Sequence, residues 1–175
     1  MKLLLHACCA DCTLKFIASV PDISPQNFAV YYYNPNIHPR SEYQSRLAAI
    51  KKICLENKVK LIIPDWQPSD YFKVVKSSKN RCPHCWQLRL STSALFAQKN
   101  SYTHFSSTLL TSHYQDQNKI TKIAQNLSKK YQLSFYQPQK IIRNLKTSGF
   151  YKQFFCGCCY SLTERYQAKY SPDKL

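Results

Sequence analysis

The stretch that decides the fold is KLLLHACCADC, residues 2–12. Residues 2–6 are a short apolar run that predicts a buried β-strand, and cysteines follow at positions 8, 9 and 12. In a parallel sheet, Cys8 and Cys9 would lie just beyond the carboxyl end of this strand, where open α/β sheets bind their ligands. The stretch therefore predicts a first strand and a functional site beside it.

Strand and helix patterns alternate along the rest of the chain. Runs rich in β-branched and aromatic residues predict further strands, or strands with their exit loops, at 28–33, 59–64, 102–110 and 134–138. Apolar residues at helical spacing predict helices at 40–57, 85–100 and 115–132, with shorter helices within 67–80 and 160–170. This order predicts an α/β fold with a mostly parallel sheet flanked by helices, in a single domain of residues 1–175. Residues 139–175 form its basic, irregular C-terminal part.

The composition excludes two familiar kinds of nucleotide site. The chain has only two glycines, Gly149 and Gly157. A phosphate-binding loop needs glycines for tight turns and close backbone approach. Neither a GxGxxG loop nor a P-loop is present, so a nucleotide-dependent mechanism of those types is not expected.

The charge balance points to a polyanionic partner. Twenty-five Lys and Arg residues face nine Asp and Glu residues, which gives a net charge of +16. Such a surface attracts nucleic acid, and we favour this interpretation over that of a merely basic protein. The apolar run at the amino terminus is too short for a secretory signal, and no stretch approaches the length of a membrane span. We therefore expect a cytoplasmic protein that does not act at a membrane.

Eight of the nine cysteines fall into three groups, and cytoplasmic cysteines are typically metal ligands or redox thiols rather than structural disulfides. The pairs Cys9/Cys12 and Cys82/Cys85 have the C-x-x-C spacing of metal ligands, which suits zinc and an iron–sulfur cluster alike. About 70 residues separate the pairs, more than in a compact zinc ribbon, and this favours a functional cluster. Cys54 lies on the apolar face of a predicted helix and is expected to pack in the core.

The third group, FFCGCC at 154–159, has a different character. Cys156 and Cys158 flank one glycine, so their thiols are within easy reach of each other. A redox-active pair that opens and closes as a disulfide is the favoured interpretation. Ligation of a second metal is the alternative.

Five segments together resemble a known family. They are LLLHACCADC, YYNPNIHPRSEYQSR, RCPHCWQLRL, STLLTSHYQDQNKI and FCGCCYS, which span residues 3 to about 162. In this order they resemble the QueH type of epoxyqueuosine reductase. The resemblance implies a Rossmann-like fold related to the adenine-nucleotide hydrolases. It also implies a cobalamin-independent oxidoreductase that carries out the last step of queuosine synthesis, the two-electron reduction of epoxyqueuosine at the tRNA wobble position.

The resemblance also assigns the site residues and partners. By matching motif, Cys8, Cys9, Cys82 and Cys85 would hold a [4Fe-4S] cluster, and Cys156 and Cys158 would form the redox-active pair. The partners would be a tRNA carrying epoxyqueuosine and an electron donor. This ligand set uses the adjacent pair Cys8/Cys9 instead of the clasp Cys9/Cys12 that spacing alone suggested.

Three positions depart from the family pattern. Asp11 replaces the usual proline before Cys12, so Cys12 and Asp11 could ligate an additional mononuclear iron or only support the site. Phe155 replaces a tyrosine. Cys159 is an extra thiol, which leaves open which two of Cys156, Cys158 and Cys159 pair.

Aromatic and basic residues supply candidate contacts to tRNA, each weighed against an ordinary surface or core role. These candidates are Tyr31, Tyr32, Tyr33, Arg40, Arg46, Arg81, Arg89 and Arg143. Two rival functions are a zinc-stabilised RNA-binding module without chemistry and a thiol oxidoreductase that acts on proteins.

Overall fold

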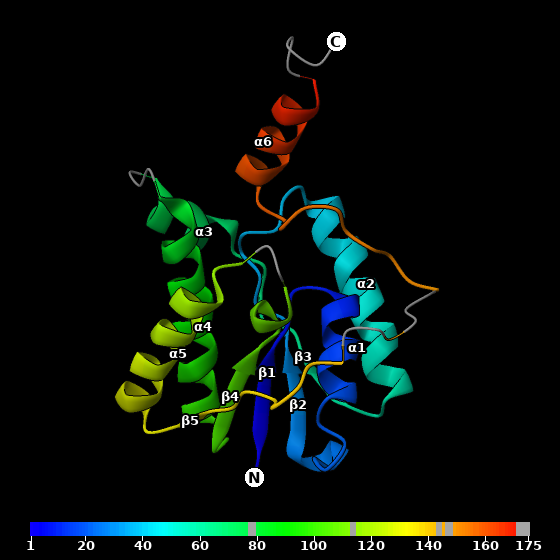
Figure 1. The fold of residues 1–175 in the computed structure, drawn as a ribbon, viewed down its shortest axis with the longest axis vertical. Coiled ribbons are helices and arrows are strands. Elements are labelled where there is room, and N and C mark those ends of the chain that lie inside the picture. The colour runs from blue at the N-terminus through cyan, green and yellow to red at the C-terminus, as the bar shows by residue number, and fades with distance from the viewer. Residues whose placement is uncertain (77–79, 113–114, 143–144, 146–148, 171–175) are drawn as a thin grey trace.

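The centre of the computed structural model is a five-stranded parallel sheet with the strand order β3-β2-β1-β4-β5 (Figure 1). The structure describes residues 1–76, 80–112, 115–142, 145 and 149–170. The strands are β1 (Leu3–His6), β2 (Phe28–Tyr31), β3 (Lys60–Ile62), β4 (His104–Ser107) and β5 (Ser134–Phe135). The last residue of β1, His6, lies opposite Tyr31 of β2 and Ser107 of β4.

Helices cover both faces of the sheet, and this is why β1 is buried throughout and begins with three leucines. They are α1 (Ala10–Ala18), α2 (Arg40–Glu56), α3 (Pro68–Val75), α4 (Arg81–Lys99), α5 (Gln117–Tyr131) and α6 (Cys159–Lys169), with short 3-10 turns at Pro25–Asn27 and Thr108–Thr111. Leu3 and Leu5 pack on one face with Phe16 of α1 and Ile50 of α2. Leu4 packs on the other face with Leu90 of α4 and Ile120 of α5. Burying each of these side chains contributes roughly 1.5–3 kcal/mol.

The strand order places a topological switch point beside β1. The chain builds β1, β2 and β3 in one direction and then returns to place β4 on the other side of β1. Loops that leave β1 and β4 at their carboxyl ends therefore diverge and leave room for a ligand. Cys8 follows β1 at this point, and Thr108 follows β4.

After β5 the chain crosses the α1 and α2 side of the sheet before it reaches α6 (Figure 1). The Ile142 amide donates to Ser19 Oγ at the end of α1, and Lys52 Nζ of α2 donates to the Gly149 carbonyl. We call residues 149–158 the C-terminal strap. It runs along α2 and returns to the carboxyl ends of the strands.

The predicted α/β fold with a parallel sheet is confirmed, and the structure adds two features. The sequence predicts no helix directly after Cys9, whereas α1 begins at Ala10. It predicts a helix from residue 85, whereas α4 begins four residues earlier, at Arg81. Both cysteine groups consequently lie at helix amino termini instead of in loops. Among the described helices, none is long and apolar enough to cross a membrane.

Candidate active site

Cysteines from three distant segments line one cavity of about 420 Å³ beyond the carboxyl ends of β1 and β4. They are Cys8, Cys9, Cys12, Cys82, Cys85, Cys156 and Cys158. Each group stands at the amino terminus of a helix: Cys9 caps α1, Cys82 lies in the first turn of α4, and Cys158 caps α6. The positive ends of three helix dipoles therefore point toward one set of sulfurs, which favours thiolates and other anions.

The first group is held by the central strand. Beyond β1, the Ala7 amide continues the sheet by donating to the Tyr31 carbonyl at 3.0 Å. The Cys8 amide then donates to Thr108 Oγ1 at 3.2 Å, and the same oxygen lies 3.4 Å from Cys8 Sγ. Cys8 is therefore fixed between the two strands at the switch point.

A buried arginine forms the floor of the cavity. Arg89 of α4 donates to His6 Nε2 at 3.3 Å and to Asn34 Oδ1 at 2.9 Å, and it lines the cavity together with Cys8 and Cys85. Burial and the Arg89 charge lower the pKa of His6, so His6 is a neutral hydrogen-bonding partner. Among the described residues Arg89 contacts no carboxylate, and a buried cation of this kind favours an anionic group in the cavity.

The second group lies in the first turn of α4, where Cys82 and Cys85 are three residues apart and share one side of the helix. Pro83 between them is tolerated because the first turn needs no amide donor. Cys85 is buried, and burial raises its pKa to about 11. The pKa of Cys9 is raised to about 12, chiefly by its hydrogen bond with Cys12. These thiols are neutral until a cation displaces their protons.

The third group is a close pair on the C-terminal strap. Cys156 Sγ and Cys158 Sγ lie 3.6 Å apart, and all nine cysteines are reduced. Hydrogen bonding from the Cys158 thiol lowers the pKa of Cys156, whereas that interaction and burial raise the pKa of Cys158. The buried Tyr71 packs in one cluster with Cys158 and Cys85. One thiolate beside one thiol is the arrangement of a dithiol redox pair.

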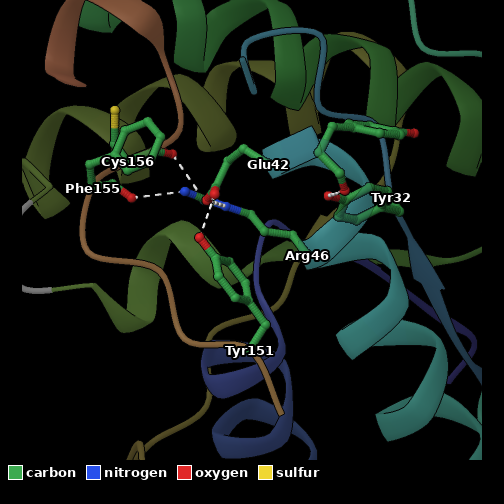
Figure 2. A network of polar contacts seen from close by, with 7 residues as sticks. Tyr32, Glu42, Arg46, Tyr151, Phe155 and Cys156 are labelled. Atoms are coloured by element: carbon green, nitrogen blue, oxygen red, sulfur yellow. Dashed lines mark hydrogen bonds and ion pairs between the residues drawn. The ribbon is translucent and has the colours of Figure 1, made fainter. Parts of the chain in front are cut away.

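A polar network attaches the strap to α2 (Figure 2). Arg46 is almost completely buried and pairs with Glu42 one turn earlier at 2.6 Å. The Arg46 guanidinium also donates to the carbonyls of Phe155 and Cys156, at 3.0 and 3.2 Å. The Tyr151 hydroxyl donates to the other oxygen of Glu42. One buried ion pair thus fixes the backbone that carries the redox thiols.

Gly157 completes this attachment. Its φ is +113°, which disfavours any side chain, and an added Cβ would lie 2.9 Å from Ile37 Cγ1. The Gly157 carbonyl accepts a hydrogen bond from the His38 amide at 2.8 Å. The glycine of the CGC sequence is therefore needed because the strap packs directly against the loop that precedes α2.

Comparisons with known proteins agree with these features. Residues 3–164 match the family described as "Epoxyqueuosine reductase QueH". The chain belongs to the QueH family. A protein of that name from Dehalococcoides mccartyi is 38% identical, with 98% of each chain covered. Another from Thermotoga maritima is 31% identical over 93% of this chain and 91% of its own, and one from Histophilus somni is 31% identical over 93% and 73%.

The cavity of this QueH-family chain offers candidate cysteine ligands for an iron–sulfur cluster. Within the described residues, no three His, Cys, Asp or Glu side chains are close enough to share one metal ion. A [4Fe-4S] cluster instead takes one sulfur for each iron, so its ligands surround a cavity. Cys8, Cys9, Cys82 and Cys85 all line the cavity, and the Arg89 cation lies against two of them.

The other predicted site residues of this QueH-family chain have different surroundings. Asp11 pairs with Lys15 at 2.8 Å and does not line the cavity, whereas Cys12 does. Cys159 is half-buried and is not a lining residue, and Cys54 packs in the core as expected. A mononuclear iron at Cys12 and Asp11 stays a prediction.

Five of the eight candidate tRNA contacts have buried side chains. Tyr31, Tyr32 and Tyr33 pack in the core. Arg46 and Arg89 belong to the internal networks described above but also line the cavity, so their contact with the substrate stays a prediction. Arg40 is exposed, Arg81 lines the cavity, and Arg143 lies outside the described residues. The Glu42–Arg46 spacing of four residues on a helix was the sequence signal for one of these buried pairs.

Proposed function

We propose that the cysteine-lined cavity is the active site of this epoxyqueuosine reductase. The protein reduces the epoxide of epoxyqueuosine in tRNA to give queuosine, the last step of queuosine synthesis. The observation that carries the assignment of the site is the convergence of residues 8–12, 82–85 and 156–158 on one cavity at the switch point of the sheet. A second cavity, between α2 and residues 149–151, is lined by no cysteine.

In this proposal Cys8, Cys9, Cys82 and Cys85 hold a [4Fe-4S] cluster, which when bound supplies electrons one at a time. With four thiolates such a cluster is anionic. Arg89 and the helix dipoles of α1 and α4 offset that charge inside the protein. Cys12 remains available for an additional mononuclear iron, with Asp11 as a second ligand if its pairing with Lys15 opens.

Cys156 and Cys158 supply the two reducing equivalents. Oxidation of the two thiols to one disulfide releases two electrons and two protons. Reduction of the epoxide to an alkene consumes two electrons and two protons and releases the oxygen as water, so the reaction balances. Tyr71 packs against this pair in one buried cluster with Cys158 and is placed to position that thiol.

An electron donor must reopen the disulfide after each turnover. A dithiol or reduced protein of the cytoplasm supplies the required chemistry, and free thiols persist in that compartment. We therefore place the enzyme in the cytoplasm with its tRNA substrate.

Anaerobic purification followed by a single-turnover assay tests the proposal. The protein should be brown and contain about four irons and four sulfides per chain, or one iron more if the mononuclear site is filled. Pre-reduced protein should convert one equivalent of epoxyqueuosine tRNA without added reductant. Zinc in a colourless protein, or turnover that survives Cys156→Ser and Cys158→Ser, would contradict it.

A further inference from the structure

Exposed aromatic side chains are concentrated at the C-terminal end of the described chain. Six aromatic residues are exposed in the part of the protein that the structure describes, and five of them lie between residues 151 and 170. They are Tyr151, Phe154, Tyr160, Tyr166 and Tyr170. Helix α6 has no buried residue and projects beyond the carboxyl ends of the strands (Figure 1). Exposed rings on a projecting helix mark an interaction surface more often than a packing surface.

Two cation–aromatic pairs stand at the rim of the cavity. The Arg165 guanidinium lies 5.3 Å from the centre of the Phe154 ring, and the Arg81 guanidinium lies 4.5 Å from that of Tyr160. Phe154, Arg165 and Arg81 also line the cavity. The Phe154 and Tyr160 rings therefore already stack against planar guanidinium groups. A ligand that enters the cavity passes these rings.

The charges at the rim favour an anionic partner. Arg81 is paired with Glu164, so its charge is largely compensated. Arg165 forms no ion pair with any described residue, and it is exposed. Lys152 and Lys169 add positive charge on the strap and on α6. Together with the net charge of +16, this surface is suited to phosphates.

We propose that Phe154, Tyr160 and Arg165 form a stacking platform for the unpaired nucleotides that flank the modified nucleotide in the tRNA. The proposal rests on the proposed function, in which the modified base leaves its stack to reach the cavity. Its neighbours then lose stacking partners, and exposed aromatic rings replace them without regard to base identity. Arg165 contacts a phosphate of these flanking nucleotides.

Binding of an anticodon stem–loop RNA tests the platform without any turnover. The probe carries unmodified guanosine at the wobble position and is titrated by fluorescence anisotropy at several salt concentrations. Phe154→Leu keeps an apolar side chain but removes the π-face, and it should weaken binding about tenfold. Phe154→Trp should bind within about twofold of the unchanged protein.

The charge of Arg165 has its own readout and a matched control. Arg165→Gln should reduce the slope of log affinity against log salt by about 0.7, as expected for one lost phosphate contact on a single strand. Lys130 is also exposed and lies over an aromatic ring, that of Tyr131, but at the opposite end of the sheet. Lys130→Gln should leave the slope unchanged.

Three results would overturn the platform. One is equal RNA affinity for Phe154→Leu and the unchanged protein, with thermal melting showing both to be folded. Another is equal weakening by the Leu and Trp variants. The third is a dimer that Phe154→Leu converts to a monomer, because this face would then bind a second copy of the chain. Failure of the reductase assay with RNA binding intact would instead count against the proposed function alone.

Discussion

The two halves of the cavity are held by different kinds of contact. Cys8 and Cys9 continue a completely buried central strand, and Cys85 lies in a helix packed on the sheet. Cys156 and Cys158 lie on the C-terminal strap, which no strand pairing supports and which depends on Arg46, Tyr151 and Gly157 for its position. Apart from Cys82, which is exposed at the start of α4, the half assigned to the cluster is therefore built on the core, whereas the redox half is attached to its surface.

This difference matches the chemistry assigned to each half. A cluster needs ligands that stay fixed, and burial in the sheet provides this. A dithiol must shorten its S–S separation from 3.6 Å to about 2 Å when it oxidises, and must then meet an electron donor. A strap fixed at a few points accommodates that movement without disturbing the sheet. Substitutions in the two halves should therefore have separable effects.

The largest separable effect is expected on iron content. Cys85→Ala should reduce iron and sulfide from about four per chain to almost none, because it removes one ligand of the cluster. Cys156→Ser should leave the iron content unchanged and abolish single turnover. Elemental analysis after anaerobic purification measures the first, and queuosine formation the second.

Cys54→Ala is the matched control, since Cys54 is an equally buried thiol that lies in the core of the sheet and α2. It should lower stability by about 1 kcal/mol through a small cavity and keep the full iron content. Equal loss of iron in Cys54→Ala and Cys85→Ala would mean that iron content reports folding and not ligation.

The next effect is expected from the buried Glu42–Arg46 ion pair of α2, which holds the strap. Arg46→Met should lower the free energy of unfolding by about 3–5 kcal/mol, because it leaves the Glu42 carboxylate buried without its cation. Urea denaturation measures this change. Lys52→Met, in the same helix, breaks an exposed pair with Glu56 at 4.0 Å and an exposed hydrogen bond to the Gly149 carbonyl, and should cost no more than about 1 kcal/mol. Similar values for the two variants would contradict the role of burial.

The two glycines provide a smaller effect on the same strap. Gly149→Ala introduces a side chain at φ +80° where the nearest atom is Lys52 Nζ at 3.6 Å, and it should cost about 1 kcal/mol. Gly157→Ala adds contact with Ile37 to a similar backbone strain and should cost about 2–3 kcal/mol. Gly157→Ala should also slow disulfide formation between Cys156 and Cys158, measured by thiol trapping. Equal costs for the two glycines would remove the argument for close packing of the strap.

The smallest expected effect is that of a single hydroxyl group. Tyr151→Phe removes one hydrogen bond to Glu42 and should cost about 1 kcal/mol in unfolding free energy. Tyr170→Phe, on an exposed ring with no hydroxyl partner among the described residues, should change nothing measurable. A cost for Tyr151→Phe as large as that for Arg46→Met would show that Tyr151, and not Arg46, holds the strap.

The fold was predictable because β1 and β2 are short, buried and largely apolar runs, and because strand and helix patterns alternate along the chain. Helix α1 was missed because only Ala10, Thr13 and Phe16 of its nine residues are buried, and the cysteines around them suggested a metal-binding loop. Pro83 likewise suggests a loop at RCPHC, although proline is acceptable in the first turn of a helix. Spacing alone therefore identified the cysteine groups but not the helix termini that present them.

The polar interior was not predictable from local sequence. Arg46 and Arg89 look like surface cations, and only tertiary contacts show that Glu42 neutralises one and that cavity thiols lie against the other. The run Tyr31–Tyr33 has the composition of a base-stacking surface, yet all three side chains are buried in the core. The exposed rings that we assign to RNA, Phe154 and Tyr160, flank the CGC sequence in a segment with no comparable local pattern.

The contact between Cys8 and Thr108 links the first strand of the chain to the fourth. All four proposed ligands have been synthesised by residue 85, but the wall that orients the first of them is made more than twenty residues later. During translation, an early fragment would expose reactive thiols with no formed site to receive iron. On the proposed ligand assignment, we therefore expect a cluster to be inserted only after β4 has been synthesised and paired with β1.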